Sequence, residues 1–235
     1  AAGSSHTFVL NKGQTLSIFP QGKSQLAADR LTGTHVTSDR PIAITLKDDT
    51  IIHPSGGCRD VVGDQLIPVN LTGAEYIVMR TFLNNQDYVY VVATQAATPI
   101  YVDNVLVATI NAGQQVQILL QNPGPNFKKI ASRLLDTDPY KPIYVFHIGG
   151  FGCEQGGAII PPIEGCTGSS KVSFTRSSSS PLYLTVMVRD GAQDGFMVDG
   201  VVRDDLIPPA SFVLVPSTSW RVARLGSFTT SQLSV

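Results

Sequence analysis

The feature that most constrains this chain is an internal repeat whose period is close to 100 residues. The run 9–18 matches the run 109–118, and both contain the letters N-x-G-Q ahead of an apolar alternation. Five further landmarks recur in the same order: 39–44 with 140–145, Gly57-Cys58 with Gly152-Cys153, 63–68 with 156–161, 72–73 with 167–168, and 101–104 with 197–200. The opening element returns near 206–214, so we predict two full units and a closing piece.

Each unit is expected to consist of short β-strands. Runs rich in β-branched and aromatic residues alternate with turns that draw on 21 Gly and 15 Pro. Asp103-Asn104 and Asp199-Gly200 each lie between apolar residues and suit the positive backbone angles of a type I′ hairpin turn. We therefore predict an all-β fold of two tandem, internally duplicated β-sandwich-like units that pack closely.

The boundary between the units is expected between residues 103 and 122, which gives units of 1–108 and 109–235. The alternative is a single body in which the two halves are related by pseudo-two-fold symmetry. One segment, 127–135, has apolar residues at helical spacing. Its counterpart in the first unit, 31–36, is rich in Thr and Gly, so we predict a strand in both places.

Composition and charge exclude several functional classes. The net charge is −1, with 17 basic and 18 acidic residues, so the sequence predicts no nucleic-acid partner. No run of apolar residues is long enough to cross a membrane as a helix. Charged residues make up 15% of the chain, so polar, uncharged side chains must cover much of a β surface.

Several of the repeat landmarks also resemble a known family. The first unit carries L-T-G-T-H-V-T-S-D-R-P-I-A at 31–43, then Cys58, G-D-Q-L-I-P-V at 63–69 and Gly73. These motifs, found from about Val9 to Leu225, resemble the IgGFc-binding protein N-terminal domain family. The second unit is similar to its bacterial, Bacteroidetes-type branch.

This resemblance implies a module of a large exported surface protein, of the kind found in adhesion and gliding motility. The matched residues are landmarks of a fold, so the resemblance does not imply antibody binding by this chain.

The chain has three cysteines. Cys153 and Cys166 lie 13 residues apart in one unit, and we predict a disulfide between them. Such a short loop would contribute about 3 kcal/mol to stability. Cys58 would then remain as a buried thiol. Alternatively, Cys58 pairs with Cys153, its equivalent in the repeat.

No metal or cofactor site is predicted. The spacings of His53 to Cys58 and of His147 to Cys153 fit no compact zinc pattern. Structural calcium is the alternative that the loop carboxylates leave open, although we expect them to be solvated turn residues. These carboxylates are Asp48-Asp49, Asp136 with Asp138, and Asp204-Asp205.

No catalytic residue is predicted either, so we expect a protein that is not an enzyme. The chain lacks Gly-x-Ser-x-Gly, and the serines at 177–180 are expected at a hairpin tip. Asp60 and Asp64 could imitate a glycosidase pair, but Gly157 replaces Asp64 in the repeat.

The sequence thus predicts an extracellular, non-enzymatic module that acts in adhesion or as a structural spacer. Its expected partners are neighbouring domains of the same polypeptide, and a glycan or protein ligand on another surface. The second hypothesis is a carbohydrate-binding module or glycan-active domain. Four aromatic residues would then stack on sugars: Tyr88, Tyr90, Tyr140 and Trp220.

Overall fold

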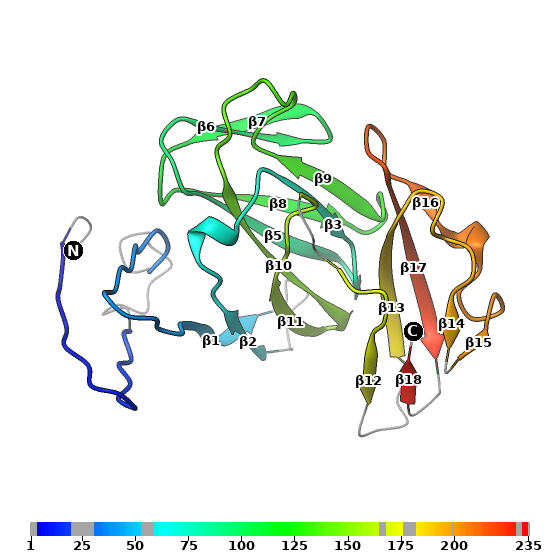
Figure 1. The fold of residues 1–235 in the computed structure, drawn as a ribbon, viewed down its shortest axis with the longest axis horizontal. Coiled ribbons are helices and arrows are strands. Elements are labelled where there is room, and N and C mark those ends of the chain that lie inside the picture. The colour runs from blue at the N-terminus through cyan, green and yellow to red at the C-terminus, as the bar shows by residue number, and fades with distance from the viewer. Residues whose placement is uncertain are drawn as a thin grey trace.

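The computed structural model describes residues 4–19, 31–52, 59–164, 168–175, 182–198, 200–228 and 232–234. These residues form β-strands joined by turns, with two short 3-10 turns at Val69–Leu71 and Pro209–Ser211 and no α-helix in the described ranges. The all-β prediction is therefore confirmed. Figure 1 shows the strands gathered into a central sandwich and a separate C-terminal group.

The sandwich consists of two mainly antiparallel sheets built from residues 75–159. In the first sheet the strand order is β11-β10-β5-β8, and the short β4 pairs with the end of β10. In the second sheet the order is β3-β9-β6-β7. The bounds in the first sheet are β4 Phe82–Leu83, β5 Gln86–Ala93, β8 Gln115–Gln121, β10 Ile143–Gly152 and β11 Glu154–Ile159. Those in the second are β3 Glu75–Met79, β6 Thr98–Val102, β7 Val105–Ile110 and β9 Phe127–Ala131.

Alternation along the strands creates the core between these two sheets. In β5 every second residue is buried, beginning with Asp87, while the residues between them are half-buried. Val89 and Val91 thereby face Tyr76 and Val78 of β3 within one apolar cluster. Each fully buried side chain of this size stabilises the fold by about 1.5 to 3 kcal/mol, so the cluster is the main source of the sandwich's stability.

Two local predictions can be checked in this sandwich. The β6–β7 hairpin turns at Asp103-Asn104, whose φ angles are 51° and 67°, as a type I′ turn requires. Asp199 of the second hairpin lies outside the described residues. The ambiguous segment 127–135 begins with a strand, β9, which pairs with β3 and β6, so the strand prediction there is confirmed. Its counterpart 31–36 contains a turn, in which the N–H of Thr34 donates to the carbonyl of Leu31 at 3.0 Å, and no strand, so the strand prediction for 31–36 is wrong.

The C-terminal group is built around a three-stranded sheet with the order β13-β17-β16, called the C-terminal sheet below. Its strands are β13 Leu182–Arg189, β16 Val213–Leu214 and β17 Trp220–Phe228. Two small antiparallel pairs accompany it: β14 Met197–Val198 with β15 Val201–Val202, and β12 Ser173–Thr175 with β18 Gln232–Ser234.

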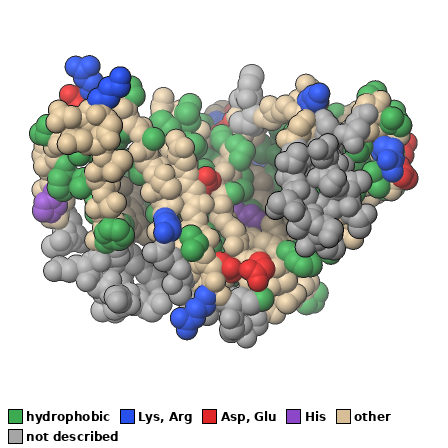
Figure 2. All heavy atoms as spheres, turned by 90° about the horizontal axis from the view of Figure 1, so that it is seen from below, with side chains coloured by type: hydrophobic (Ala, Val, Ile, Leu, Met, Phe, Trp, Pro, Cys, Tyr) green, Lys and Arg blue, Asp and Glu red, His purple; other side chains and the backbone are tan. Residues whose placement is uncertain are grey.

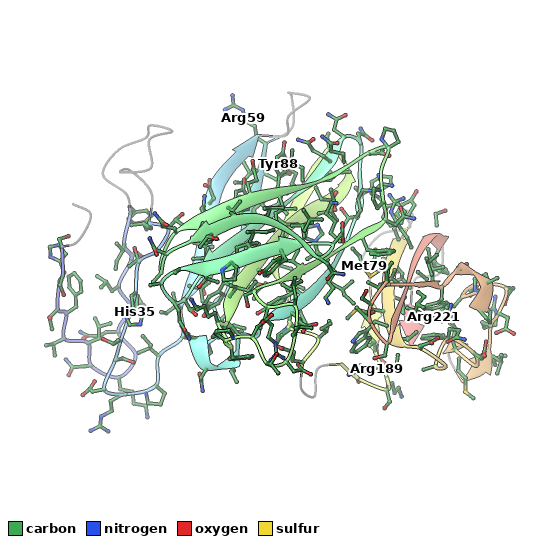
Figure 3. All side chains as sticks on the ribbon, turned by 90° about the horizontal axis from the view of Figure 1, so that it is seen from above. His35, Arg59, Met79, Tyr88, Arg189 and Arg221 are labelled. Atoms are coloured by element: carbon green, nitrogen blue, oxygen red, sulfur yellow. The ribbon has the colours of Figure 1, made fainter. Side chains whose placement is uncertain are left out.

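Successive residues of β3 and β17 point to opposite faces, and this stacks the C-terminal sheet on the sandwich. Tyr76 and Val78 point into the sandwich core, whereas Ile77 packs with Trp220 and Val222 of β17. The alternate residues of β17, beginning with Ala223, enter a third apolar cluster within the C-terminal group. Figure 3 shows Met79 on the side of the sandwich that faces this group.

The first part of the chain lies at the other end of the molecule (Figure 1). Residues 4–19 and 31–44 form no strand, and β1 (Thr45–Ile52) pairs only with β2 (Arg59–Gln65) among the described residues. β2 lies along β11, at the edge of the first sheet.

The expected boundary at 103–122 falls within the sandwich, because β7 and β8 belong to its two sheets. The division into units 1–108 and 109–235 therefore stays a prediction about the repeat.

Candidate functional site

The candidate site is the seam where β3 and β9 of the sandwich meet the C-terminal sheet. Its middle is apolar and contains Ile77, Val215, Trp220 and Val222. One end opens into a polar cleft around Arg133, and the other end holds a cluster of aromatic rings around Arg224. β3 and β17 together fix this layout, since Glu75 and Trp220 border the cleft while Thr81 and Arg224 meet at the far end.

Arg133 is the centre of the polar cleft, which has a volume of about 240 Å³. Its guanidinium lies 2.8 Å from Glu164 Oε1, 3.2 Å from Asp136 Oδ1 and 3.8 Å from Glu75 Oε1. The second oxygen of Glu164 accepts a hydrogen bond from the backbone N–H of Ala74 at 2.6 Å. Three carboxylates thus surround one half-buried cation, and Glu75 also pairs with the ammonium of Lys129 at 3.5 Å.

Aromatic rings flank this charged network. The guanidinium of Arg133 lies 5.3 Å from the centre of the Tyr140 ring, and that of Arg189 lies 4.0 Å from the Trp220 ring. Arg189 also donates to the hydroxyl of Ser219 on the rim of the cleft. Burial raises the pKa of the Tyr140 hydroxyl, and the negative charge of Glu164 raises it further, so this ring stays neutral near pH 7.

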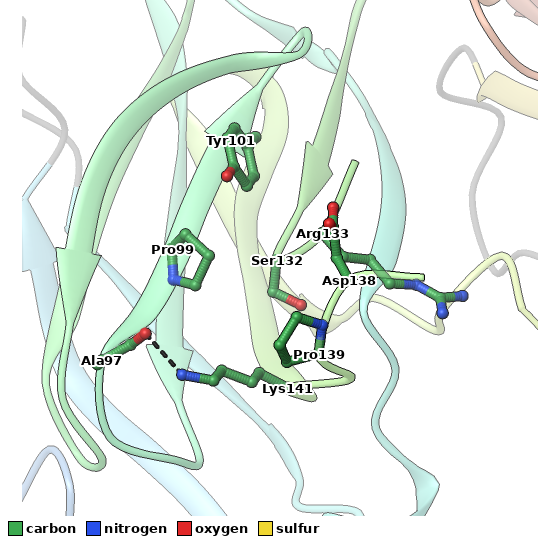
Figure 4. A pocket seen from close by; sticks show the side chains of 8 residues that line it. All are labelled: Ala97, Pro99, Tyr101, Ser132, Arg133, Asp138, Pro139 and Lys141. Carbon is green, nitrogen blue, oxygen red and sulfur yellow. Dashed lines mark hydrogen bonds between the residues drawn. The ribbon is translucent and has the colours of Figure 1, made fainter. Parts of the chain in front are cut away.

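A second hollow, of about 270 Å³, shares Arg133 with the cleft (Figure 4). Lys141 closes one side of it, where its ammonium donates to the carbonyls of Ala96 and Ala97 at 2.9 and 2.7 Å. On another side, Asp138 accepts from the backbone N–H groups of Leu135 and Leu134, which lowers the pKa of its carboxyl. The walls therefore combine fixed charges with the ring of Tyr101.

The far end of the seam is held by Arg224 and three aromatic rings. Two nitrogens of Arg224 donate to the carbonyl of Thr81 at 3.0 and 2.5 Å, and the guanidinium lies 3.9 Å from the Phe82 ring. The ring of Tyr183 stands between Phe82 and Phe151, at 4.5 and 4.6 Å from their centres. Burial lowers the pKa of Arg224, and the charge of Arg80 lowers it further.

A buried polar group lies just behind this end. Asp87 is fully buried, and its Oδ2 accepts from the N–H of Thr81 at 2.5 Å and lies 2.9 Å from His147 Nε2. In the described part of the chain no hydroxyl or thiol is hydrogen-bonded to this imidazole. Asp87 fixes the backbone at the start of β4 and thereby the position of Phe82.

The other residues that the sequence analysis considered as cysteine or metal sites do not come together in one site among the described residues. Cys153 is disulfide-bonded, whereas Cys166 and Cys58 lie outside the described residues, so the Cys153–Cys166 bond stays a prediction. His53 also lies outside them. Asp205 pairs with Arg203 at 2.7 Å. Over the described ranges, no three His, Cys, Asp or Glu side chains are grouped as a metal site would require.

Asp60 and Asp64 do not face each other across a cleft. The carboxylate of Asp60 accepts from the N–H of Gln155 at 2.9 Å, and that of Asp64 accepts from the N–H of Ile159 at 2.7 Å. Both N–H groups lie on β11, whose hydrogen-bonded neighbour in the sheet is β10. The two aspartates therefore bind the backbone at the edge of the sandwich.

The four aromatic residues suggested as sugar platforms do not form one surface. Trp220 is buried in the seam, and Tyr140 stands at the cleft beside Arg133. Tyr88 and Tyr90 share the outer face of β5, where Gln117 of β8 donates to the hydroxyl of Tyr90 at 2.9 Å. Figure 2 shows charged side chains scattered over one face of the molecule without a broad patch of one sign among the described residues.

Fold and seam together define a protein of stacked, mainly antiparallel β-sheets with polar clefts between layers. A family model described as "IgGFc binding protein" matches residues 1–234, so the chain belongs to this family. Searches of curated proteins and of solved structures gave no match. In the described ranges, no helix is both long and apolar enough to cross a membrane.

Proposed function

We propose that this chain is a non-enzymatic module of a large exported cell-surface protein that acts in adhesion or as a structural spacer. Membership of the family supports a binding module of the extracellular type. The observation that carries the proposal is the polar cleft, in which Arg133 is paired with three carboxylates and lies over the Tyr140 ring, while Arg189 lies over the Trp220 ring. Arginine and aromatic side chains of this kind dominate the binding energy of protein interfaces.

The cleft suits a ligand with hydrogen-bonding groups, such as a glycan or a polar segment of another protein. Arg189 and Arg133 present N–H donors, Asp136 presents acceptors, and the Tyr140 ring offers an apolar face. Arg133 is already held by its ion pairs, and Arg189 by Ser219 and the Trp220 ring, so binding would require little further ordering of these two side chains.

The test is binding of the purified chain to a glycan array and to immobilised IgG Fc fragment. Asp136→Arg reverses an exposed charge in the cleft. We expect it to weaken the affinity for whichever glycan or Fc fragment the native chain binds by at least about tenfold, which is about 1.4 kcal/mol of binding free energy. Asp194→Arg makes the same change at an exposed position that lines neither cleft and should bind as the native chain does.

Fractionation of cells that make the full-length protein tests the location. We expect the protein in the surface or secreted fraction, with binding that is reduced in Asp136→Arg alone. A cytoplasmic protein, or equal binding by the two variants, would contradict the proposal.

A second candidate is carbohydrate binding on the outer face of the first sheet. Tyr88 and Tyr90 are separated by one residue on β5, so both rings lie on this face, next to the exposed Gln117. Rings beside amide groups are suited to stack on sugars while hydrogen-bonding their hydroxyls. Loss of glycan-array signal in Tyr90→Ala, but not in Asp136→Arg, would favour this face over the cleft.

A further inference from the structure

The first part of the chain exposes apolar side chains that a folded protein normally buries. We use "the N-terminal segment" for residues 4–19 and 31–44, where no strand forms. Val9 is 88% exposed and Phe19 is 78% exposed, and seven other large apolar residues of the segment are also open to solvent. Exposed apolar side chains that gather in one part of a chain are typical of an interaction site.

The segment shares its local structure with a part of the sandwich. In the turn 11–14, the N–H of Asn11 donates to Gln14 Oε1 at 2.8 Å, and the N–H of Gln14 donates to the carbonyl of Asn11 at 3.0 Å. The turn 111–114 between β7 and β8 contains the same two bonds, at 2.8 and 2.9 Å. The repeat found in the sequence is therefore supported by matching geometry at this turn.

Equivalent residues differ sharply in burial. Ile18 is 53% exposed, whereas its counterpart Ile118 in β8 is 8% exposed. Ile42 follows Pro41 and is 54% exposed, whereas its counterpart Ile143 follows Pro142 and is fully buried in β10. The same motif is thus buried in the sandwich and uncovered in the N-terminal segment, which lacks the strands that cover Ile143.

The strand that pairs with Ile143 indicates which strand Ile42 lacks. Ile143, Tyr144 and Val145 of β10 pair with Ala93, Val92 and Val91 of β5. The repeat offset of 96 residues places 86–93, the span of β5, on 182–189, the span of β13. In the described part of the chain β13 pairs with β17 on one side only, so its other edge is unpaired. Unpaired strand edges are templates for another chain.

We propose that residues 42–44 of one copy of this chain pair with β13 of a second copy. The register follows from the sandwich: Ile42 opposite Arg189, Ala43 opposite Val188, and Ile44 opposite Met187, with antiparallel strands. Met187 packs against the apolar middle of the seam, so Ile44 would extend that cluster. This self-association goes beyond the proposed adhesive function and does not depend on it.

A second copy fits better than the chain's own β13. The N-terminal segment and the C-terminal sheet lie at opposite ends of the molecule, with the sandwich between them (Figure 1). β2 is held on β11 by Asp60 and Asp64, which keeps the attached β1 at that end. Each copy carries one N-terminal segment and one β13 edge, which are different surfaces, so the contact is head-to-tail and can continue into a linear chain of copies.

The first experiment measures molar mass by light scattering over a range of protein concentrations. The native chain should increase in mass as its concentration rises, and Ile42→Asp should remain monomeric with an unchanged melting temperature, because the side chain is exposed in the monomer. The matched control is Val105→Asp on the β7 hairpin, where the apolar side chain is 65% exposed, and this variant should associate as the native chain does.

The second experiment tests the register by cross-linking engineered cysteines. Ala43→Cys combined with Val188→Cys should give disulfide-linked dimers and longer ladders on non-reducing gels. Ala43→Cys with Met187→Cys, which is out of register by one residue, should give far less, and each single variant reports the background from native thiols. A native chain that is monomeric at every concentration, or a cross-link that forms within one chain, would overturn the proposal.

Discussion

At the scale of single residues, the best-defined electrostatic device is the turn that Asp138 closes. Its carboxylate accepts hydrogen bonds from two consecutive backbone N–H groups, those of Leu134 and Leu135, at 3.0 and 2.9 Å. These bonds favour the charged form, so the pKa of Asp138 lies below its usual value. A group whose pKa is lowered on folding stabilises the folded state above its unfolded-state pKa, and this contribution is lost as pH falls through the folded-state pKa.

We therefore expect Asp138→Ala to be less stable than the native chain at neutral pH. The difference should begin to shrink as the pH falls below the range in which free aspartate titrates, and it should vanish only below the lowered folded-state pKa, where the native carboxylate becomes protonated. Urea unfolding midpoints at a series of pH values measure this. Asp194→Ala removes an exposed carboxylate that is hydrogen-bonded to no described residue and should show no such convergence. A difference in urea midpoint between the native chain and Asp138→Ala that stays constant with pH would contradict this role of Asp138.

Some residues could be interpreted correctly from sequence because their chemistry is local. Asp103-Asn104 predicts a type I′ turn by itself, since both residues tolerate positive φ, and the hairpin has that geometry. Arg133 gave no such signal. Its partners Glu75 and Glu164 come from distant parts of the chain. The pairing of β3 with β9 brings Glu75 to Arg133, and the bond from the N–H of Ile163 to the carbonyl of Glu75 brings Glu164 there.

At the scale of elements, the attachment of β2 to β11 shows how the same residues can be misinterpreted. Asp60 and Asp64 are four residues apart, a spacing that suggests a catalytic pair when the secondary structure is unknown. On a strand, residues at that spacing lie on the same face, so both carboxylates reach one neighbouring strand. Each binds a backbone N–H of β11, which blocks an edge that would otherwise attract other chains.

We expect Asp60→Ala to destabilise the chain by about 1.5 to 3 kcal/mol, the usual range for a hydrogen bond to a charged group. Chemical denaturation measures the loss, and hydrogen exchange at Gln155 should accelerate more than exchange in β5. Asp60→Asn is the conservative variant, since an amide oxygen can still accept the bond, and it should recover part of the stability. Equal stability of the native chain and Asp60→Ala would refute this role.

Periodicity alone also failed to decide the type of one element. The apolar residues after Phe127 recur at helical spacing, and the strand prediction there was based on comparison with 31–36, which itself forms no strand in the structure. In the structure Ile130 enters the sandwich core while Phe127 packs into the seam. β9 is therefore covered on both faces, which removes the simple alternation that identifies a half-exposed strand.

At the scale of the whole molecule, the seam makes the C-terminal sheet depend on the sandwich. Gly226 of β17 lies against the ring of Tyr183, and this ring is held between Phe82 and Phe151. A Cβ at position 226 would collide with the Tyr183 ring, which has little room to move.

We expect Gly226→Ala to destabilise the molecule by about 1 to 3 kcal/mol, the usual cost of overpacking. Limited proteolysis should show earlier cleavage after position 182 than within the sandwich. Adding Tyr183→Ala should relieve the collision, so the double variant should lose less stability than the sum of the two single variants. Additive losses would show that the collision is not the cause.

Cys153 is disulfide-bonded, and the repeat indicates which cysteine is its partner. β2 and β11 run side by side with Asp60 bound at Gln155 and Asp64 at Ile159, an offset of 95 residues in both cases. Gly57-Cys58 and Gly152-Cys153 match in the sequence at the same offset. Two partners were left open by the sequence, and this shared offset favours Cys58 over Cys166.

Peptide mapping of the unreduced chain by mass spectrometry should therefore recover a peptide that contains both Cys58 and Cys153. Such a bond closes a loop of roughly a hundred residues, so its removal in Cys58→Ser should cost about 4.7 kcal/mol if loop entropy dominates. Cys166→Ser should then leave stability nearly unchanged and serves as the matched control. A peptide that joins Cys153 to Cys166, with the two variants exchanging their effects, would instead establish the short-loop bond that the spacing of 13 residues predicts.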